Sequence, residues 1–412
     1  MIDSYSQITK HHNNRNWELY LFSIVLFLLN PLASLICILN LIINGRWHSE
    51  DALNVWSILL ALWISLFNAT KIPESDQLMY QGWYVSAVDY TNLKTIFSYS
   101  GAVYKEPIYG LFQSVMHFVF NGNIHLFWIS VSFIEYYLLF KSIEIILLNS
   151  QRDYKCVICG IICCAFFTQF FSLTLHLIRQ MLAFSIILYA IALRCKDNKI
   201  HYIYFIIAPL IHTTSILFVL LALYKPIYHQ LKKKQILFLA GILLALILGS
   251  IIVGSFMMSL IGENNSSSYL FRRMQQQSDE GNDFNILITF VLIIPLLIIS
   301  IVNLKRLNKR HQFSSPLYPI IHLFLFLSLF VIGMSARPLI QYRFAFVTYY
   351  FIGFILPLLF NNKNKFNNTY YIAISSFFIL RFFITFNNGT WNYAINITDI
   401  LTWPVPLYFF SS

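Results

Sequence analysis

Long apolar runs alternate with short polar segments along most of this chain of 412 residues. A membrane-spanning helix needs about 20 apolar residues, because the hydrocarbon core of a bilayer is about 30 Å thick. The runs that approach this length are 19–43, 51–69, 124–148, 156–175, 178–195, 236–260, 284–303, 317–335, 344–360 and 370–386. The pattern therefore predicts a bundle of membrane-spanning helices.

Two further apolar runs, 106–120 and 201–224, are shorter or interrupted. The second contains Pro209 and His212, and basic residues flank both of its ends. Lysine and arginine collect in cytoplasmic loops, so both ends are predicted to lie on the cytoplasmic side. A single span cannot place both ends on one side. The run is therefore predicted to form two short helices that enter the membrane and return, with their tip near His212.

The basic loops set the orientation of the chain. The loops that carry lysine or arginine, and are therefore predicted to be cytoplasmic, are 149–155, 194–199, 225–235, 304–311 and 361–369. The segments then predicted to lie outside are the larger loop 261–283, the short loop 336–343 and the tail after residue 387. A single integral membrane domain is expected over residues 1–412, with residues 1–18 as a polar cytoplasmic leader.

The first third of the chain allows two topologies. Strict alternation from a cytoplasmic N-terminus places the larger loop 70–105 inside. The same loop lies outside if 106–120 only dips into the membrane, or if 19–43 is a hairpin that turns at Asn30-Pro31.

Composition supports the membrane interpretation and excludes other classes. Hydrophobic residues make up 58% of the chain and charged residues only 11%, against about 25% charged in soluble domains. The fold class is therefore all-α and polytopic, with about 11–13 spanning or half-spanning helices. The net charge of +11 lies in short loop clusters, so no nucleic-acid partner is expected. Four of the six cysteines scatter along the run KCVICGIICCAFF, and no metal site or cofactor is predicted.

Polar residues near the predicted membrane boundaries are the candidates for chemistry, because a charge at the centre of a helix costs about 2.5–3.5 kcal/mol to insert. Asp76, Tyr80 and Tyr84 are four residues apart and share one face of a helix. A carboxylate can bind sugar hydroxyls, and aromatic rings can stack on a sugar ring. The alternative is an interfacial helix anchored by tyrosines. Glu106 precedes Pro107, where capping of a helix is favoured over catalysis.

Two further candidates occur around the middle of the chain. His176 and Arg179 lie at the outer, N-terminal end of the helix 178–195, where free N–H groups and the helix dipole favour an anion such as a diphosphate. The alternative for Arg179 is contact with lipid phosphates. His212 is either a catalytic residue at the tip of the hairpin or a hydrogen-bonded core histidine.

Arg337 and Arg343 flank the short outer loop 336–343, contrary to the usual distribution of positive charge. Together with Arg179 they could bind a diphosphate, and the alternative is binding of lipid headgroups.

These positions together resemble the EpsG-type branch of the Wzy oligosaccharide repeat-unit polymerases over roughly residues 50–360. The residues that carry the resemblance are Asp76, Tyr80, Tyr84, Glu106-Pro107, Arg179 in IRQMLA, His212 in IHTTS and Tyr342-Arg343-Phe344. The chain departs from the family at Lys71, where such proteins tend to carry arginine.

The resemblance implies a multi-pass protein of the bacterial inner membrane, similar in fold to membrane glycosyltransferases that use polyprenyl donors. It implies polymerisation of undecaprenyl-diphosphate-linked repeat units of O-antigen or a related polysaccharide, with the active site and the loop 70–105 at the periplasmic face. The expected partners are these lipid-linked oligosaccharides, membrane lipid and a chain-length regulator protein. Two alternatives remain: a flippase for the same lipid-linked oligosaccharide, and an O-antigen ligase.

The residues divide by expected role. Asp76, His212 and Glu106 are the candidates for orienting or deprotonating the acceptor hydroxyl. The candidates for binding the diphosphate and the sugars are Arg179, Arg337, Arg343, Tyr80, Tyr84 and His176.

Overall fold

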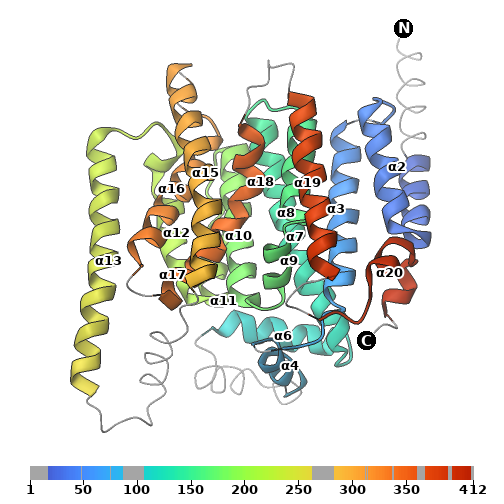
Figure 1. Cartoon of the computed structure of the whole chain (residues 1–412), viewed down its shortest axis with the longest axis horizontal. Coiled ribbons are helices and arrows are strands. Elements are labelled where there is room, and N and C mark those ends of the chain that lie inside the picture. Colours follow the sequence, from blue (N-terminus) through green and yellow to red (C-terminus); the bar gives the residue numbers. More distant parts are fainter. Residues whose placement is uncertain are drawn as a thin grey trace.

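The computed structural model is a bundle of helices, most of which run between two opposite faces of the molecule (Figure 1). It describes residues 17–47, 49–74, 76–86, 106–261, 283–310, 312, 314–335, 338–359, 367–387 and 392–409. Arg337, the leader before Trp17, most of the loop 261–283 and the second half of the loop 70–105 lie outside the described residues.

The helices follow the apolar runs closely. The α-helices after Trp17–Leu29 are α2 (Pro31–Ile43), α3 (Ser49–Asn68), α4 (Asp76–Ser86), α6 (Pro107–Val119), α7 (Ile124–Asn149), α8 (Tyr154–Ala165), α9 (Thr168–Thr174), α10 (Ile178–Asp197), α11 (Tyr202–Ile211), α12 (Ile216–Leu223), α13 (Lys233–Ile261), α15 (Asp283–Lys309), α16 (Leu317–Gly333), α17 (Pro338–Thr348), α18 (Ile352–Ile355), α19 (Asn367–Asn387) and α20 (Ile397–Thr402). The 3₁₀ turns are η2 (Thr213–Ser215), η3 (Lys225–Tyr228), η5 (Tyr349–Phe351), η6 (Leu356–Leu358) and η7 (Val405–Phe409).

The prediction of an all-α polytopic membrane protein is confirmed. Among the described residues, four helices are long and apolar enough to cross a membrane, and the pair α8 and α9 makes a fifth if it is counted as one span bent by 61°. Several predicted spans are broken instead of continuous. The run 344–360 is divided among α17, η5, α18 and η6, and further apolar helices contain only 10–17 residues.

The run 19–43 is a hairpin rather than one helix. Asn30 leaves the helical conformation, and its side chain accepts a hydrogen bond from the backbone N–H of Ala33 to cap α2. The Ser34 hydroxyl donates to the carbonyl of Ser23 at 2.8 Å, although the two residues are 11 positions apart. A straight helix would separate them by roughly 16 Å, so the chain reverses at Asn30-Pro31. This is one of the two topologies that place the loop 70–105 on the outer side.

The run 201–224 also reverses, as predicted. α11 ends at Ile211, and His212 adopts an extended conformation before η2 and α12 begin. Arg194, near the C-terminus of α10, donates to the carbonyl of Ala222 at 2.9 Å. The end of α12 therefore returns to the side from which α11 starts, and His212 lies at the tip of the hairpin.

The two faces of the bundle differ in chemistry. We call the face at the C-terminus of α10 the basic face. There Lys155 donates to Asn368 at 3.4 Å and Arg306 donates to the carbonyl of Leu359 at 3.0 Å. The N-terminus of α10 and the hairpin tip lie at the other face, which α4 and α6 cross almost at right angles to the bundle (Figure 1). α10 has 20 residues, so the two faces are roughly 30 Å apart.

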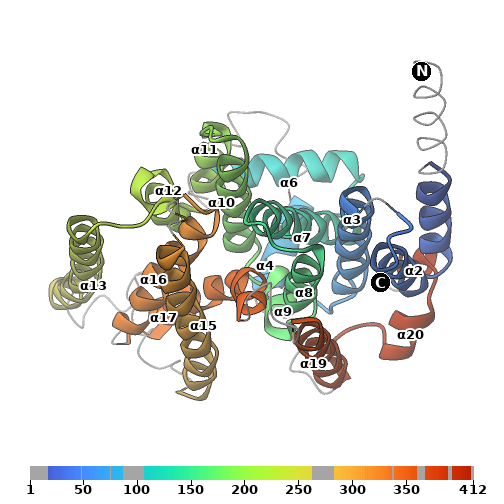
Figure 2. The same ribbon diagram turned by 90° about the horizontal axis from the view of Figure 1, so that it is seen from above.

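α7 occupies the centre of the bundle, with α3, α8 and α10 around it (Figure 2). Close backbone contact joins this centre to α18. A Cβ atom added to Gly160 of α8 would lie 2.3 Å from the carbonyl oxygen of Gly353, and one added to Gly353 would lie 2.6 Å from the oxygen of Gly160. Only glycine fits at either position, which fixes the segment that follows α17 against the core.

Candidate functional site

Glu106 is the centre of a polar cluster at the face opposite the basic loops. It occupies the N-cap position of α6, but its side chain makes no capping hydrogen bond. One carboxylate oxygen, Oε2, pairs with Nη1 of Arg179. The other, Oε1, accepts from Nδ1 of His212 at 2.7 Å and from the backbone N–H of Thr213 at 2.9 Å. The favoured prediction, that Glu106 caps a helix, is therefore wrong.

Arg179 reaches this carboxylate from the first turn of α10, where the sequence placed it. Its Nε donates to the Tyr80 hydroxyl at 3.3 Å. The guanidinium carbon lies 5.5 Å from the ring centroids of both Tyr80 and Trp83 and 6.0 Å from that of Tyr109. Aromatic faces stabilise a cation at such distances, so α4 and α6 hold the guanidinium in one orientation. Its side chain keeps 19% of its surface exposed.

His212 and Thr213 enter the cluster from the tip of the hairpin. His212 terminates α11, and the backbone N–H of Thr213 points at the carboxylate because the chain leaves the helix there. The Thr213 hydroxyl adds a longer contact of 3.4 Å to Glu106. The cluster of Glu106, Arg179, His212, Thr213 and Tyr80, which we call the Glu106 cluster, thus joins four segments that are distant in the sequence.

The electrostatics of the Glu106 cluster favour an ionised carboxylate. Burial alone raises the pKa of Glu106, but the hydrogen bond and charge of His212, the charge of Arg179 and the backbone N–H of Thr213 lower the pKa below its usual value. Burial raises the pKa of the Tyr80 phenol, which therefore stays neutral despite the nearby Arg179.

Other predicted site residues lie next to the cluster. Gln180 donates to the backbone carbonyl of Arg343 at 2.8 Å, which brings α17 against the N-terminus of α10. His176 interacts electrostatically with Arg343 and with Asp76. Asp76 begins α4, one turn before Tyr80. Arg179 and Arg343 are therefore at the same face, as the sequence predicted, whereas Arg337 lies outside the described residues.

Lys71 is a member of this neighbourhood that the sequence did not single out for a role. Only 2% of its surface is exposed, and its ammonium donates to the carbonyl of Ser172 at 3.3 Å. Burial lowers its pKa to about 7, an effect that the charge of Glu74 opposes. Its charge in turn lowers the pKa of His176, although burial of the imidazole is the larger cause. An antiparallel bridge to Tyr393 fixes the backbone of Lys71.

The two tyrosines expected to stack on sugar are both buried. Tyr80 is 4% exposed and Tyr84 is 0% exposed. The Tyr84 ring stacks on Phe127 at 4.4 Å, and its hydroxyl donates to the backbone carbonyls of Met116 and Asn123. Tyr84 thus packs α4 onto α6 and α7, and neither ring offers an open face to a sugar in this structure. This corrects the expectation for both residues, because the four-residue spacing defined a shared face but not what covers that face.

The arrangement can perform acid–base chemistry and bind anions. A carboxylate that accepts from Nδ1 of an imidazole fixes the tautomer whose Nε2 can accept a proton. A guanidinium beside it can bind phosphate oxygens. No group of histidine, cysteine or acidic side chains that could hold a metal ion occurs within the described ranges.

Sequence reasoning missed the central position of Glu106 and the aromatic enclosure of Arg179. An acid before a helical proline is a common capping pattern, so it gave no sign that the side chain faces another segment. The signal that was available lay in Trp83 and Tyr109, which are each one turn from a predicted site residue on α4 or α6.

Residues 54–395 match the model of the EpsG family, and this range includes the whole Glu106 cluster. No curated protein and no solved structure matches the chain.

Proposed function

Since the chain belongs to the EpsG family, we propose that it polymerises oligosaccharide repeat units carried on undecaprenyl diphosphate. The product is O-antigen or a related surface polysaccharide. The protein is a multi-pass membrane protein, and we place it in the bacterial inner membrane with the Glu106 cluster at the periplasmic face. That orientation follows from the basic loops at the opposite face, which the positive-inside rule assigns to the cytoplasm.

One observation carries the proposal: Glu106 binds both Arg179 and His212 at the outer face. An acid that meets a guanidinium and an imidazole from two other segments is typical of a functional site, because such partners set the charge state of each group. This pair lies among further charged groups, Lys71, Asp76 and Arg343, which a purely structural pair would not need.

In the proposed reaction, an acceptor sugar hydroxyl of one lipid-linked repeat unit attacks the anomeric carbon of the growing glycan. A new C–O bond forms, and the bond from the anomeric carbon to the diphosphate oxygen breaks. Nε2 of His212 takes the proton of the hydroxyl, while Glu106 orients the imidazole and stabilises its positive charge. Asp76 is the alternative base.

The leaving group keeps the electron pair of the broken bond, so negative charge grows on the diphosphate. Arg179 and Arg343 would stabilise this charge. Nη1 and Nε of Arg179 are directed to Glu106 and Tyr80, which leaves Nη2 as the nitrogen for a phosphate oxygen. Arginine suits this position better than lysine, because one ammonium cannot bond the carboxylate, the phenol and a phosphate in a fixed plane.

The test is replacement of Arg179 by alanine or lysine in the native host, with surface polysaccharide analysed on a gel. Both variants are expected to lose long chains, because the polymerisation rate should fall by roughly 10²–10³-fold. A loss of that size is typical when one hydrogen-bond donor that stabilises a transition-state charge is removed. Arg381→Lys, on α19, is the control for an ordinary arginine substitution. Normal ladders from Arg179→Ala at normal protein levels would remove Arg179 from the mechanism.

Deletion of the gene separates polymerisation from the two alternatives. Loss of a polymerase leaves a single repeat unit on each acceptor lipid. Loss of a flippase prevents even single units from reaching the surface, and loss of a ligase leaves acceptor cores without any units. The single-unit phenotype is the expected one.

A further inference from the structure

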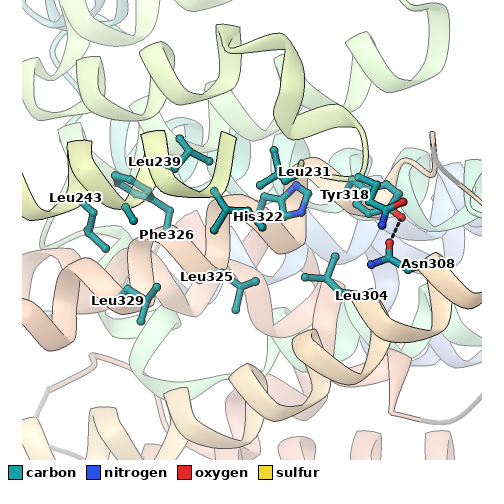
Figure 3. Close-up of a pocket in the computed structure, with 13 residues that line it drawn as sticks. Leu231, Leu239, Leu243, Leu304, Asn308, Tyr318, His322, Leu325, Phe326 and Leu329 are labelled. Atoms are coloured by element: carbon teal, nitrogen blue, oxygen red, sulfur yellow. Dashed lines mark hydrogen bonds between the residues drawn. The ribbon is translucent and has the colours of Figure 1, made fainter. Parts of the chain in front are cut away.

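A lipid-facing groove lies at the basic face, far from the Glu106 cluster. It has a volume of about 290 Å³ and lies between α13 on one side and α15 and α16 on the other (Figure 3). The apolar part of its lining comes from all three helices and includes Leu239, Leu243, Leu304, Leu325 and Leu329. Ile236 and Leu329, at its margin, are 53% and 50% exposed, so the groove opens sideways toward lipid.

One end of the groove is polar. Tyr318 and His322 project there from the first turns of α16, with Asn308 of α15 beside them (Figure 3). Gln230 also lines the groove. The Tyr318 hydroxyl donates to the Asn308 carboxamide oxygen at 2.7 Å. The NH₂ group of Asn308 therefore points away from the Tyr318 hydroxyl. Nδ1 of His322 is bonded to the carbonyl of Ile227 at 2.9 Å. The polar groups are thus held in place by the protein.

The segments that supply the polar end are basic. The segments 225–235 and 304–316, which meet there, contain no aspartate or glutamate. Their basic residues are Lys225, Lys232, Lys233, Lys234, Lys305, Arg306, Lys309 and Arg310. Lys232 follows the lining residue Leu231, and Lys309 follows the lining residue Asn308; both lysines are exposed.

The length of the groove suits one leaflet of a bilayer. Tyr318 and Leu329 are 11 residues apart on α16, which is roughly 16 Å along the helix axis and about half the thickness of the hydrocarbon core. A lipid whose headgroup lies at the basic rim would therefore place an acyl chain along the apolar part. Basic pockets between membrane helices on the cytoplasmic side bind anionic headgroups.

We infer that this groove binds a diacyl phospholipid with an anionic headgroup, drawn from the leaflet at the basic face. The lipid that carries the glycan would not fill this role, because its diphosphate must lie at the opposite face while it reacts. The choice of a diacyl phospholipid over the glycan-carrying lipid rests on the proposed function, whereas the binding of an anionic headgroup rests on the lining and charge of the groove alone.

The experiment uses purified full-length protein in detergent, with retained lipid counted by native mass spectrometry. The probes are phosphatidylglycerol and phosphatidylcholine with identical acyl chains. Phosphatidylglycerol is expected to bind about 25-fold more tightly to the wild-type protein, since Lys232 and Lys309 beside the headgroup contribute about fivefold each. Equal retention of the two lipids would overturn the inference.

Two pairs of variants locate the site. Ala240→Trp fills the groove and is expected to reduce phosphatidylglycerol retention by about tenfold. Ala245→Trp, on the same helix but outside the groove, should retain the lipid. Retention by Ala240→Trp equal to that by Ala245→Trp would exclude the groove as the site.

The second pair tests the charge. K232Q/K309Q is expected to lower the retention of phosphatidylglycerol toward that of phosphatidylcholine. K196Q/K199Q, with the same loss of charge in the last turn of α10 and the loop after it, should keep the preference for phosphatidylglycerol. Thermal unfolding of each variant verifies that it is folded. Equal effects of the two charge pairs would show that only net charge matters and would also overturn the inference.

Discussion

Glu106 and Glu135 are both buried in this bundle, and their surroundings are opposite. Glu106 is 3% exposed, and both of its oxygens are bonded to donors from other segments. Glu135, in the middle of α7, is 0% exposed, and neither of its oxygens has a hydrogen-bond partner among the residues described here. Near it, Asn68 donates to Ser132 at 3.2 Å and to Thr174 at 2.7 Å.

This difference between Glu106 and Glu135 shows that burial of an acid and a functional role are separate properties. A buried charge is stable only when it is paired and hydrogen-bonded, and Glu106 meets that condition with a cation, an imidazole and a backbone N–H. The surroundings of Glu135 offer no cation within hydrogen-bonding distance in the described part of the chain. Burial of an acid therefore does not by itself indicate a reactive site; convergence of cationic partners from separate segments does.

The largest expected effect comes from replacing each acid by its neutral isostere. Glu106→Gln should lower polymerisation by about 10²–10⁴-fold, because the amide no longer stabilises a charged imidazole. Glu135→Gln should change it less than about threefold, since no described group depends on a charge there. Polysaccharide ladders measured at matched protein levels compare the two. Equal losses of polymerisation from the two substitutions would show that Glu106 and Glu135 do not differ in function.

The next effect separates the two roles assigned to His212, which are the hydrogen bond from Nδ1 to Glu106 and the uptake of a proton at Nε2. In His212→Asn the side-chain amide can replace Nδ1 as the donor to Glu106, but it has no atom equivalent to Nε2. This variant should keep the thermal stability of the wild type and lose polymerisation by about 10²-fold or more. His212→Gln, whose amide is displaced toward the position of Nε2, is the control that loses the bond to Glu106. Activity retained in His212→Asn would show that another group, such as Asp76, is the base.

A smaller effect, on stability, depends on pH. The pKa of Glu106 is lower in the folded chain than the value of about 4.3 expected when unfolded. Its stabilising effect is therefore complete above that value and is lost as the pH falls through the lower, folded pKa. Removing one partner of such a pair costs about 3–5 kcal/mol. Wild type and Glu106→Gln should differ most in unfolding temperature near neutral pH, and the difference should disappear at acidic pH.

For Glu135→Gln, the same comparison should give little or no loss of unfolding temperature near neutral pH. A loss as large as that of Glu106→Gln would mean that Glu135 is paired in the membrane-embedded protein.

The smallest effects distinguish the two buried tyrosines of α4. Tyr84→Phe loses hydrogen bonds to two backbone carbonyls and should cost about 1 kcal/mol of stability without changing polymerisation. Tyr80→Phe removes the acceptor of Arg179 Nε and should lower activity by roughly fivefold at similar stability. Unfolding temperatures and gel ladders of the two variants test this. If Tyr84→Phe lost activity and Tyr80→Phe did not, Tyr84 would be a residue of the functional site.

Much of the fold could be predicted from the sequence, because apolar runs and basic loops are local signals. The reversal near His212 followed from the lysines on both sides of the run 201–224. The placement of Arg179 at a helix N-terminus followed from the end of the preceding run. By contrast, the pairing of Glu106 with these residues could not be predicted. It depends on how α6 packs across the bundle, and no periodicity within Glu106-Pro107 encodes that contact.

The hairpin of α11 and α12 has a consequence for how the protein is made. Glu106 precedes Arg179 by 73 positions and His212 by 106 positions, so during synthesis the acid leaves the ribosome long before either partner. A nascent chain that stops before α10 leaves this carboxylate without its cation, and one that stops before the hairpin leaves it without its imidazole. Completion of the hairpin is thus the step at which both oxygens of the Glu106 carboxylate have their partners, and truncated or misinserted chains are expected to be targets for membrane proteolysis.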